Sequence, residues 1–371
     1  RVWLNILATC SSVCATTYVV MLSAAHDILE KQESRNETAS VREQMFGNSS
    51  NSSIYDCNPV STAVNKGSLI NSSTLLSLIT FSVAVFAGVI FASISSGLGE
   101  LSFLSLTVYF SSVLEGWGSG TGAAGLIGAL LYSVLIQAGL SPRVTLLIML
   151  VVPLTMVVSY FFLLVFPPSL PQWRTKETEY AALVSEDRQQ LLDSSDEEDQ
   201  TATELDFCEQ GLWKFVLQLG VVYLTEYFIN QGLVSPLMPS SSTLSSLHAV
   251  SETWYQTLYQ LGVLLSRSSL HCVKIRKVWI LSVLQTLNAV FLLLAVRYLF
   301  LPTVWLVFAF ILYEGLLGGA AYVNTFHFIS KEVKDNRHRE FSMAAASIGD
   351  SLGITVAGLI SLPVHTYFCS L

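Results

Sequence analysis

Three carboxylates lie inside long apolar segments of this sequence, where an ionisable side chain is costly. Glu314 lies near the centre of the segment 304–329, and Glu226 and Asp350 lie in two other apolar blocks. A helix of roughly 20 residues crosses a lipid core about 30 Å thick. A carboxylate at that depth must face protein, water or a partner charge. The pattern therefore predicts a membrane protein with a polar interior, in which a solute or an ion binds or through which it passes.

The segment around Glu226 carries its polar side chains on one face. At helical spacing, Tyr223, Tyr227, Asn230 and Gln231 fall on the same stripe as this carboxylate. In a membrane, such a stripe must face protein or a water-filled cavity. Two interpretations remain open: a site for a solute or a proton, and a seam of hydrogen bonds between helices.

The segment 304–329 repeats this arrangement. Glu314 and Tyr322 share one helical face, and Asn324 and His327 lie toward one end. Because an imidazole titrates near neutral pH, His327 is a candidate proton relay in an acidic organelle. A histidine that only packs between helices is the alternative.

Asp350 lies among glycines, which allow neighbouring helices to approach closely. A buried aspartate there calls for a basic partner. Arg267 and Arg297 are the arginines near predicted spans, and the sequence alone does not choose between them.

Glycine-rich stretches follow acidic spans in both halves of the chain. Glu100 precedes the stretch 118–128, and Glu314 precedes the stretch 349–358. The first stretch could expose backbone amides to a phosphate at a helix N-terminus, or it could provide small residues for helix packing. The repetition itself suits transporters built from two related halves, whose sites lie near the middle of the membrane.

Composition excludes several classes of protein. The 371 residues are 52% hydrophobic and 12% charged, with a mean hydropathy of +0.55, whereas soluble domains carry about 25% charged residues. The net charge of −8 comes from one segment, 173–210, which holds twelve acidic and three basic residues. Nucleic-acid binding therefore has no support. The six cysteines show no metal-site spacing, and no HExxH motif occurs. We expect no metal, no cofactor and no enzymatic activity.

The pattern of apolar and polar segments predicts an all-α, polytopic bundle of about nine spans. We expect a first transmembrane helix in 1–29, a glycosylated luminal loop in 30–74, the rest of an N-terminal bundle in 75–166, an acidic cytosolic loop in 167–211 and a C-terminal bundle in 212–371. Among these spans, the block 252–267 has the weakest hydropathy signal. The luminal loop contains four N-x-S/T sequons, at Asn36, Asn48, Asn51 and Asn71.

Lys and Arg residues set the expected orientation. They form one cluster after the block 252–267 and another after 303–329. The two clusters lie on the same side of the membrane if two spans separate them. Basic loops favour the cytosol, and counting spans places the acidic loop 167–211 there as well. The same count places the sequons in the lumen, where glycosylation requires them.

The acidic loop carries a pattern that predicts a sorting signal. Asp187, Leu191 and Leu192 fit the D/E-x-x-x-L-L pattern that adaptors of the clathrin type read in endolysosomal proteins. Ser194 and Ser195 precede acidic residues, as acidophilic kinases prefer, and phosphorylation there would add further negative charge. A solvated linker with a chance pair of leucines is the alternative.

Several long strings resemble the battenin family of lysosomal membrane proteins, the family linked to neuronal ceroid lipofuscinosis. The resemblance covers most of the chain outside the two polar loops. It is carried by YVVMLSAAHDIL (18–29), FASISSGLGE (91–100), GSGTGAAGLIGAL (118–130), EYFINQGL (226–233), SRSSL (266–270), YEGLLGGAAYVNTFH (313–327) and GDSLG (349–353).

The resemblance implies a distant relative of the major facilitator fold, with two halves, in the membranes of lysosomes and late endosomes. It also implies a part in lysosomal pH and in clearance of glycerophosphodiesters, with basic amino acids second. Family members have about eleven spans, so the N-terminal half here is expected to lack a cytosolic tail and one to two early spans.

We therefore expect the export of a small polar solute from the lumen, linked to protons. The alternative is a membrane scaffold that regulates endolysosomal and Golgi vesicle traffic through its cytosolic loop. The expected partners are the bilayer, the solute, protons and the sorting machinery. The expected pathway residues are Glu100, Glu226, Tyr227, Asn230, Arg267, Glu314, Tyr322, Asn324, His327 and Asp350.

Overall fold

The computed structural model describes residues 87, 90, 91, 94–109, 113–163, 198–233, 245–298, 300, 301, 303–333 and 336–369. All regular structure within these ranges is helical. The elements are helical residues 94–107, α4 (Leu114–Gln137), α5 (Pro142–Met149), α6 (Val151–Val158), α8 (Glu198–Phe228), α10 (Ser245–Ser268), α11 (Val278–Tyr298), α12 (Val304–Glu332) and α13 (Asn336–Cys369). Two π-helical turns, η2 (Ser159–Leu163) and η3 (Ile229–Leu233), continue α6 and α8, and a 3₁₀ turn, η4 (Ser269–His271), continues α10.

Six helical stretches in the described part of the chain are long and apolar enough to cross a membrane. They are Leu114–Gln137, Arg143–Phe162, Gly211–Leu233, Val278–Tyr298, Trp305–Glu332 and His338–Val364. The predicted all-α membrane bundle is confirmed. The predicted first span, in 1–29, lies outside the described residues.

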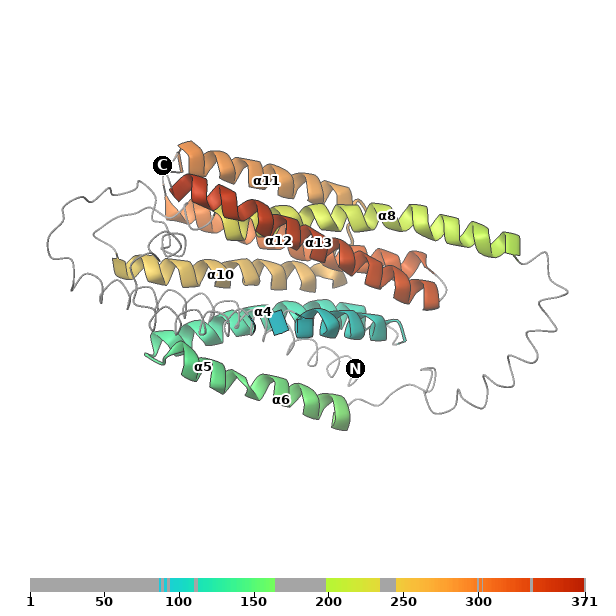
Figure 1. The fold of residues 1–371 in the computed structure, drawn as a ribbon, viewed down its shortest axis with the longest axis horizontal. Helices are drawn as coiled ribbons and strands as arrows, with labels where there is room; N and C mark the ends of the chain where they lie inside the picture. The colour runs from blue at the N-terminus through green and yellow to red at the C-terminus, as the bar shows by residue number, and fades with distance from the viewer. Residues whose placement is uncertain are drawn as a thin grey trace, which may run out of the picture.

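Helix α10, which contains the block of weakest hydropathy, lies inside the bundle between α4 and α12 (Figure 1). Its polar side chains pack against other helices, and Gln260 is buried beside Gly125 of α4. Polar residues are tolerated in a membrane bundle where neighbouring helices cover them. This position explains why α10 has low hydropathy and is still a full-length member of the bundle.

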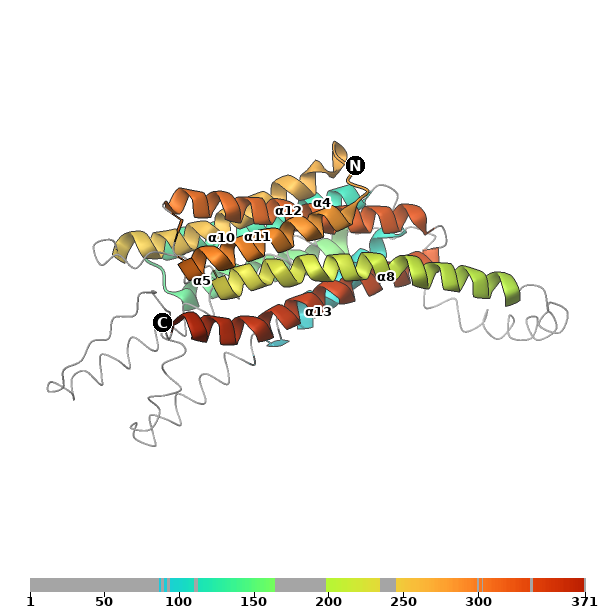
Figure 2. The ribbon, with the colours of Figure 1, turned by 90° about the horizontal axis from the view of Figure 1, so that it is seen from above.

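The helices pack as closely spaced pairs. α8 lies along α13, α10 lies along α12, and α11 contacts both α8 and α12 (Figure 2). Glycines make these approaches possible, because a Cβ on Gly262 would lie 2.5 Å from the carbonyl oxygen of Leu312, and one on Gly349 would lie 2.6 Å from that of Val216. Small residues at helix contacts are typical of membrane bundles.

The glycine-rich stretch 118–128 lies within α4 and not in its first turn. A Cβ on Gly122 would lie 2.9 Å from the Cα of Leu264 in α10. This contact supports helix packing as the role of the stretch. At the other end of α4, Gly139 has a positive φ of 88°, and Ser141 caps α5 by accepting the Val144 N–H at 3.4 Å, so the chain reverses sharply there.

The two basic loops lie at one end of the bundle. The α10–α11 and α12–α13 connections are at the end where α6 finishes and α8 begins, to the right in Figure 1. The end of α6 and the start of α8, between which the acidic loop was predicted, therefore lie at the same end of the bundle as these two connections. We refer to this end as the cytosolic end, following the expected orientation. The last turn of α13 lies at the opposite end.

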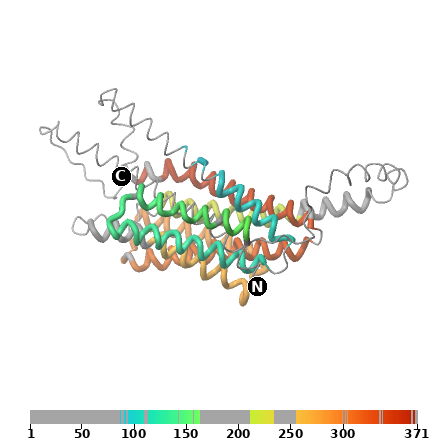
Figure 3. The backbone as a smooth tube through the Cα atoms, turned by 90° about the horizontal axis from the view of Figure 1, so that it is seen from below, coloured from blue at the N-terminus to red at the C-terminus, as the bar shows by residue number. Residues whose placement is uncertain are grey.

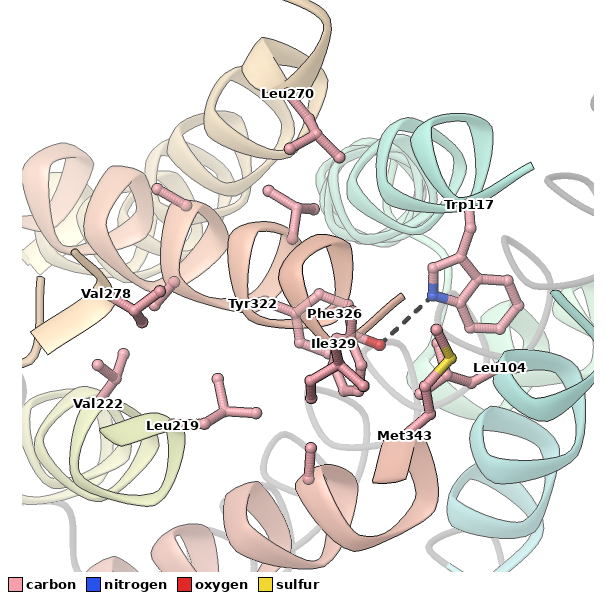
Figure 4. Packing of buried hydrophobic residues seen from close by; sticks show 14 of the residues in the cluster. Leu104, Trp117, Leu219, Val222, Leu270, Val278, Tyr322, Phe326, Ile329 and Met343 are labelled. Atoms are coloured by element: carbon pink, nitrogen blue, oxygen red, sulfur yellow. Dashed lines mark hydrogen bonds between the residues drawn. The ribbon is translucent and has the colours of Figure 1, made fainter. Parts of the chain in front are cut away.

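A buried apolar cluster fills the bundle toward the cytosolic end. It joins Trp117 of α4, Leu219 of α8, Phe326 of α12 and Met343 of α13 (Figure 4). Helical residues 94–107 pack on the same part of α13 (Figure 3), and the Thr107 hydroxyl lies 4.0 Å from the Met343 sulfur. The cluster fixes the helices that carry the polar groups described next.

Candidate functional site

Glu226 lies where three helices meet. One carboxylate oxygen accepts a hydrogen bond from the Tyr259 hydroxyl of α10, and the other is buried with no hydrogen-bond partner in the part of the chain that the structure describes. Gly318 of α12 lies directly against the carboxylate, since a Cβ at that position would overlap it. The side chain is 2% exposed. A polar oxygen buried without a partner carries a substantial desolvation cost, which makes this position unusual for a group that serves packing alone.

Glu314 of α12 is buried more completely than Glu226. Its side chain is 0% exposed, and neither carboxylate oxygen has a hydrogen-bond partner among the described residues. It interacts electrostatically with Glu226. A carboxyl in such surroundings is stable only if it binds a proton, a cation or water.

Arg267, near the end of α10, is held by neutral groups. It donates to the Thr121 hydroxyl at 2.7 Å and to the Tyr223 hydroxyl at 3.4 Å. Its guanidinium carbon lies 4.1 Å from the centre of the Tyr322 ring, a cation–π contact. No carboxylate within the described ranges forms an ion pair with it, and its Nε is buried without a partner.

Tyr322 connects Arg267 to two helices of the N-terminal region. Its hydroxyl donates to Glu100 at 2.5 Å and accepts from the indole N–H of Trp117 at 3.4 Å (Figure 4). Its ring also contacts that of Tyr223, with centroids 6.4 Å apart. The predicted residues Glu100, Arg267 and Tyr322 are therefore brought together around one guanidinium.

Asp350 of α13 is buried and pairs with no arginine of the described ranges. Its carboxylate accepts a hydrogen bond from the neighbouring Ser351 hydroxyl at 3.2 Å. It interacts electrostatically with Glu100 and Arg267, but in the part of the chain that is described it forms no ion pair with either Arg267 or Arg297. Arg297 is exposed, near the opposite end of α11.

Asn324 has a structural role in the described fold. Its side-chain oxygen accepts the Ile275 N–H at 2.7 Å, and its amide group donates to the Ala320 carbonyl at 2.8 Å. These bonds tie the α10–α11 connection to α12. His327 is buried one turn closer to the cytosolic end, with its ring 5.4 Å from that of Phe328.

Tyr227 and Asn230 lie near Glu226 on the polar stripe of α8 and η3. The Tyr227 ring stacks on the Tyr223 ring, with centroids 6.2 Å apart. The Asn230 backbone carbonyl accepts a hydrogen bond from the Tyr255 hydroxyl at 3.5 Å. The side-chain oxygen of Asn230 is buried, with no partner among the residues that the structure describes. Both interpretations of the stripe therefore receive support: part of it is a seam, and part is left unpaired.

Sequence reasoning missed several polar groups of this interior. Tyr259 binds Glu226, and Thr121 binds Arg267. Gln285 and Asn288 of α11 are buried, and their amide atoms have no partner within the described ranges. The spacing of Gln285 and Asn288, three residues apart within an apolar segment, is the signal that could have identified them. Tyr259 precedes Gln260 in the block of weak hydropathy, 252–267. The polar character of this block was a further indication that its side chains face the interior.

The other predicted sites are not in the described ranges. They are the sequons at Asn36, Asn48, Asn51 and Asn71, the sorting signal at Asp187, Leu191 and Leu192, and the phosphorylation sites at Ser194 and Ser195. Within the described ranges, no group of three His, Cys, Asp or Glu side chains could hold a metal ion.

The fold and its buried charges define a multi-pass helical membrane protein with a polar interior. A family model described as CLN3 protein matches residues 12–371. Battenin of Canis lupus familiaris is 45% identical, in an alignment that covers 96% of this chain and 88% of the relative. The chain belongs to the battenin family, as its motifs predict.

Fungal relatives match over a shorter part of the chain. Protein BTN1 of Yarrowia lipolytica is 40% identical over 76% of this chain and 72% of its own length. Protein BTN1 of Candida albicans is 39% identical, with coverage of 76% and 73%.

Proposed function

We propose that this protein exports a small polar solute from the lumen of lysosomes and late endosomes, together with protons. Glycerophosphodiesters are the leading cargo, ahead of basic amino acids. The observation that carries the proposal is the burial of Glu226 and Glu314 within electrostatic reach of each other. Helix packing alone does not require two acidic groups in one apolar interior.

Glu314 is the best candidate for proton coupling. Among the described residues, neither of its oxygens has a hydrogen-bond partner, so no hydrogen bond from this part of the chain stabilises its charged form. A proton from the acidic lumen neutralises it, and the neutral cytosol removes that proton. Because protons then move down their gradient in the direction of export, they drive the solute outward.

Arg267 supports an anionic cargo. A guanidinium presents several N–H groups in one plane and matches the geometry of phosphate or carboxylate oxygens. The neutral partners of Arg267 leave its charge uncompensated by any direct ion pair within the described residues. A bound phosphodiester would supply that negative charge.

Cargo reaches these groups only if helices move apart. Glu226 and Glu314 are almost fully buried, and α4 and α10 are in close contact through Gly122 and Leu264. The described arrangement therefore corresponds to an occluded form. Alternating exposure of such a site to the two sides of a membrane is the general mode of action of two-half transporters.

The first test replaces Glu314 by Gln in lysosomes loaded with a glycerophosphodiester. The variant keeps the size of the side chain and removes its proton exchange, so we expect export to stop while the amount and location of the protein are unchanged. Glu332→Gln, an exposed carboxylate of the same helix, is the matched control and should export normally.

A second variant distinguishes the vesicle-traffic scaffold from a transporter. Deletion of 187–199 removes the sorting signal and the acidic run, and it should mislocate the protein without loss of export by reconstituted protein. Two results together would support the scaffold. The deletion variant, although correctly located, fails to clear the solute, and the Glu314→Gln variant clears it normally.

A further inference from the structure

Helix α11 carries two amide side chains at the centre of its buried face. Gln285 is 0% exposed and Asn288 is 4% exposed, whereas the opposite face of the helix presents apolar side chains outward, among them Val283, Leu287 and Val290. Within the described ranges, none of the four amide atoms has a hydrogen-bond partner. Because unpaired buried polar atoms are costly, packing alone does not account for two amides at this position.

Two contacts fix how α11 lies along α12. The Ile275 N–H, just before α11, donates to the Asn324 side chain at 2.7 Å. Farther along, the rings of Phe291 and Phe310 lie 4.7 Å apart between their centres. The residue numbers rise along α11 and fall along α12 between these contacts, so the two helices are antiparallel.

The same contacts place Glu314 at the depth of the two amides. Glu314 follows Phe310 by four residues along α12. Along α11, Asn288 precedes Phe291 by three residues and Gln285 precedes it by six. In antiparallel helices these steps run in the same direction, so Glu314 lies at a depth between the two amides.

Glu314 lies on the stripe of α12 that faces α11. At helical spacing it falls in line with Phe310 and Asn324, which make the two contacts just described. It also interacts electrostatically with Glu226 of α8. Its carboxylate therefore lies near the junction of α8, α11 and α12.

The two amides of α11 face this junction. Ser282 of α11 donates to the Gln218 carbonyl of α8 at 3.0 Å, and Phe291 contacts α12. Each step of three residues changes the direction of a side chain by roughly 60°. Gln285 and Asn288, the two steps between Ser282 and Phe291, therefore point between α8 and α12, on the buried side of the helix.

Water satisfies this set of groups better than a metal ion does. A cation would bind the carboxylate and amide oxygens, but it would leave the two NH2 groups unpaired. Water both donates and accepts, and a buried water typically makes about three hydrogen bonds to groups that lack other partners. Water between the amides and Glu314 also provides a chain along which a proton can move to or from the carboxyl group.

The ionisable groups near Glu314 come from other helices. Among the described residues, Glu226 of α8 and Tyr259 of α10 interact with it electrostatically. The ionisable residues of α11 are Arg297 and Tyr298, which are exposed in its last turn. Because an amide does not titrate, Gln285 and Asn288 can position water but do not themselves exchange protons.

Unpaired polar groups continue from this junction toward the end of the bundle opposite to the cytosolic end. The Asn230 side-chain oxygen and the Ser361 hydroxyl are buried there, with no partner in the described part of the chain. The Ser361 oxygen lies 3.2 Å from the position that a Cβ on Gly232 would occupy. Ile229, next to Asn230, packs in one cluster with Ala289 of α11. These groups therefore extend the polar line toward the lumen.

We propose that Gln285 and Asn288 hold water against Glu314 and that this water carries protons between Glu314 and the lumen. The two amides are positioning residues, since they act on the proton through water. This inference rests on the proposed function. It assigns the proton a route along α11, on another side of Glu314 from the groups of α4 and α10.

The experiment compares net uptake with exchange, both by the complete chain in liposomes. Net uptake of labelled glycerophosphocholine is driven by a pH gradient, with the acidic side and the solute outside, and it requires Glu314 to bind and release a proton in every cycle. Exchange of labelled for unlabelled solute is measured at the same acidic pH on both sides, where Glu314 keeps its proton. A residue of the proton route therefore affects net uptake and not exchange.

Two variants remove the hydrogen bonds of the amides and nearly keep their size. Gln285→Leu and Asn288→Leu should each lower net uptake roughly tenfold or more, because a positioned proton route typically contributes at least that much. Both should retain solute exchange. Asn288→Ser, whose hydroxyl can still hold water, should recover most of the net uptake that Asn288→Leu loses. Ser282→Ala is the matched control, since this hydroxyl on the same helix already has a partner, and it should keep both rates.

Each outcome has a distinct meaning. Wild-type net uptake in both leucine variants overturns the inference, and so does an equal loss of net uptake and exchange, which a purely structural role predicts. A loss in Asn288→Ser as large as in Asn288→Leu overturns the role of water. If net uptake by wild-type protein does not respond to the pH gradient, the proposed function itself fails.

Discussion

Gly318 of α12 lies so close to the carboxylate of Glu226 in α8 that a single added methyl group would overlap it. The glycine therefore makes the space in which the acid lies. This contact links the packing of two helices directly to the position of a buried charge.

Replacing Gly318 by Ala should displace Glu226 and lower both stability and transport. Overpacking of a tight interior typically costs about 1–3 kcal/mol, so the thermal unfolding midpoint should fall and the initial rate of uptake should drop. Gly97→Ala is the control, since a Cβ there meets nothing within 4 Å. An unchanged midpoint and rate in Gly318→Ala would show that Glu226 does not depend on this space.

Tyr259→Phe should weaken the hold on Glu226 without changing the size of the ring. The substitution removes the hydrogen bond from the Tyr259 hydroxyl, and loss of a partner for a buried polar group typically costs about 1–3 kcal/mol. We expect a lower thermal midpoint and a raised KM for the solute. Tyr313→Phe, on the more exposed face of α12, should change neither quantity.

The expected orientation is tested with Cys272. This free thiol is exposed in the α10–α11 connection, beside the cluster of Glu115, His271 and Lys274. In a variant whose other cysteines are replaced by Ser, a membrane-impermeant maleimide should label intact lysosomes from the cytosolic side. Labelling that appears only after the membrane is opened would reverse the assigned orientation of the whole bundle.

Glu115 binds His271 Nδ1 at 2.9 Å and lies 3.9 Å from the Lys274 Nζ. These pairs join α4 to the α10–α11 connection at the cytosolic end. Because exposed ion pairs contribute only about 0–1 kcal/mol, Glu115→Gln should change the thermal midpoint little. It should instead increase the rate of Cys272 labelling, since the connection is held less firmly. A large fall in the midpoint with no change in labelling would contradict this account.

Hydropathy predicted the helical bundle because every long apolar run must form a helix to satisfy its backbone in lipid. It could not place α10, whose polar residues are covered by α4 and α12. The acidic residues Glu226 and Glu314 were predicted as pathway groups from their depth in apolar segments. Their contacts were not predictable, because Tyr259 and Gly318 come from other helices.

Asn324 illustrates the limit of reasoning from residue type. As a polar residue in an apolar span it was a candidate for the pathway, but it binds the Ile275 N–H of a neighbouring connection. An amide side chain can hydrogen-bond either a solute or a backbone group. Only the packing of the helices distinguishes a pathway residue from a structural one. The same holds for Arg267, whose neutral partners are supplied by α4 and α8.

The most direct test of proton-linked export is the uptake of glycerophosphocholine by proteoliposomes with and without a pH gradient. The acidic compartment is the one that contains the solute. We predict that wild-type protein then takes up the solute several-fold faster than it does without a gradient. Glu314→Gln should show the same rate under both conditions. Wild-type uptake that does not respond to the gradient, or a Glu314→Gln variant that responds as wild type does, would contradict the account.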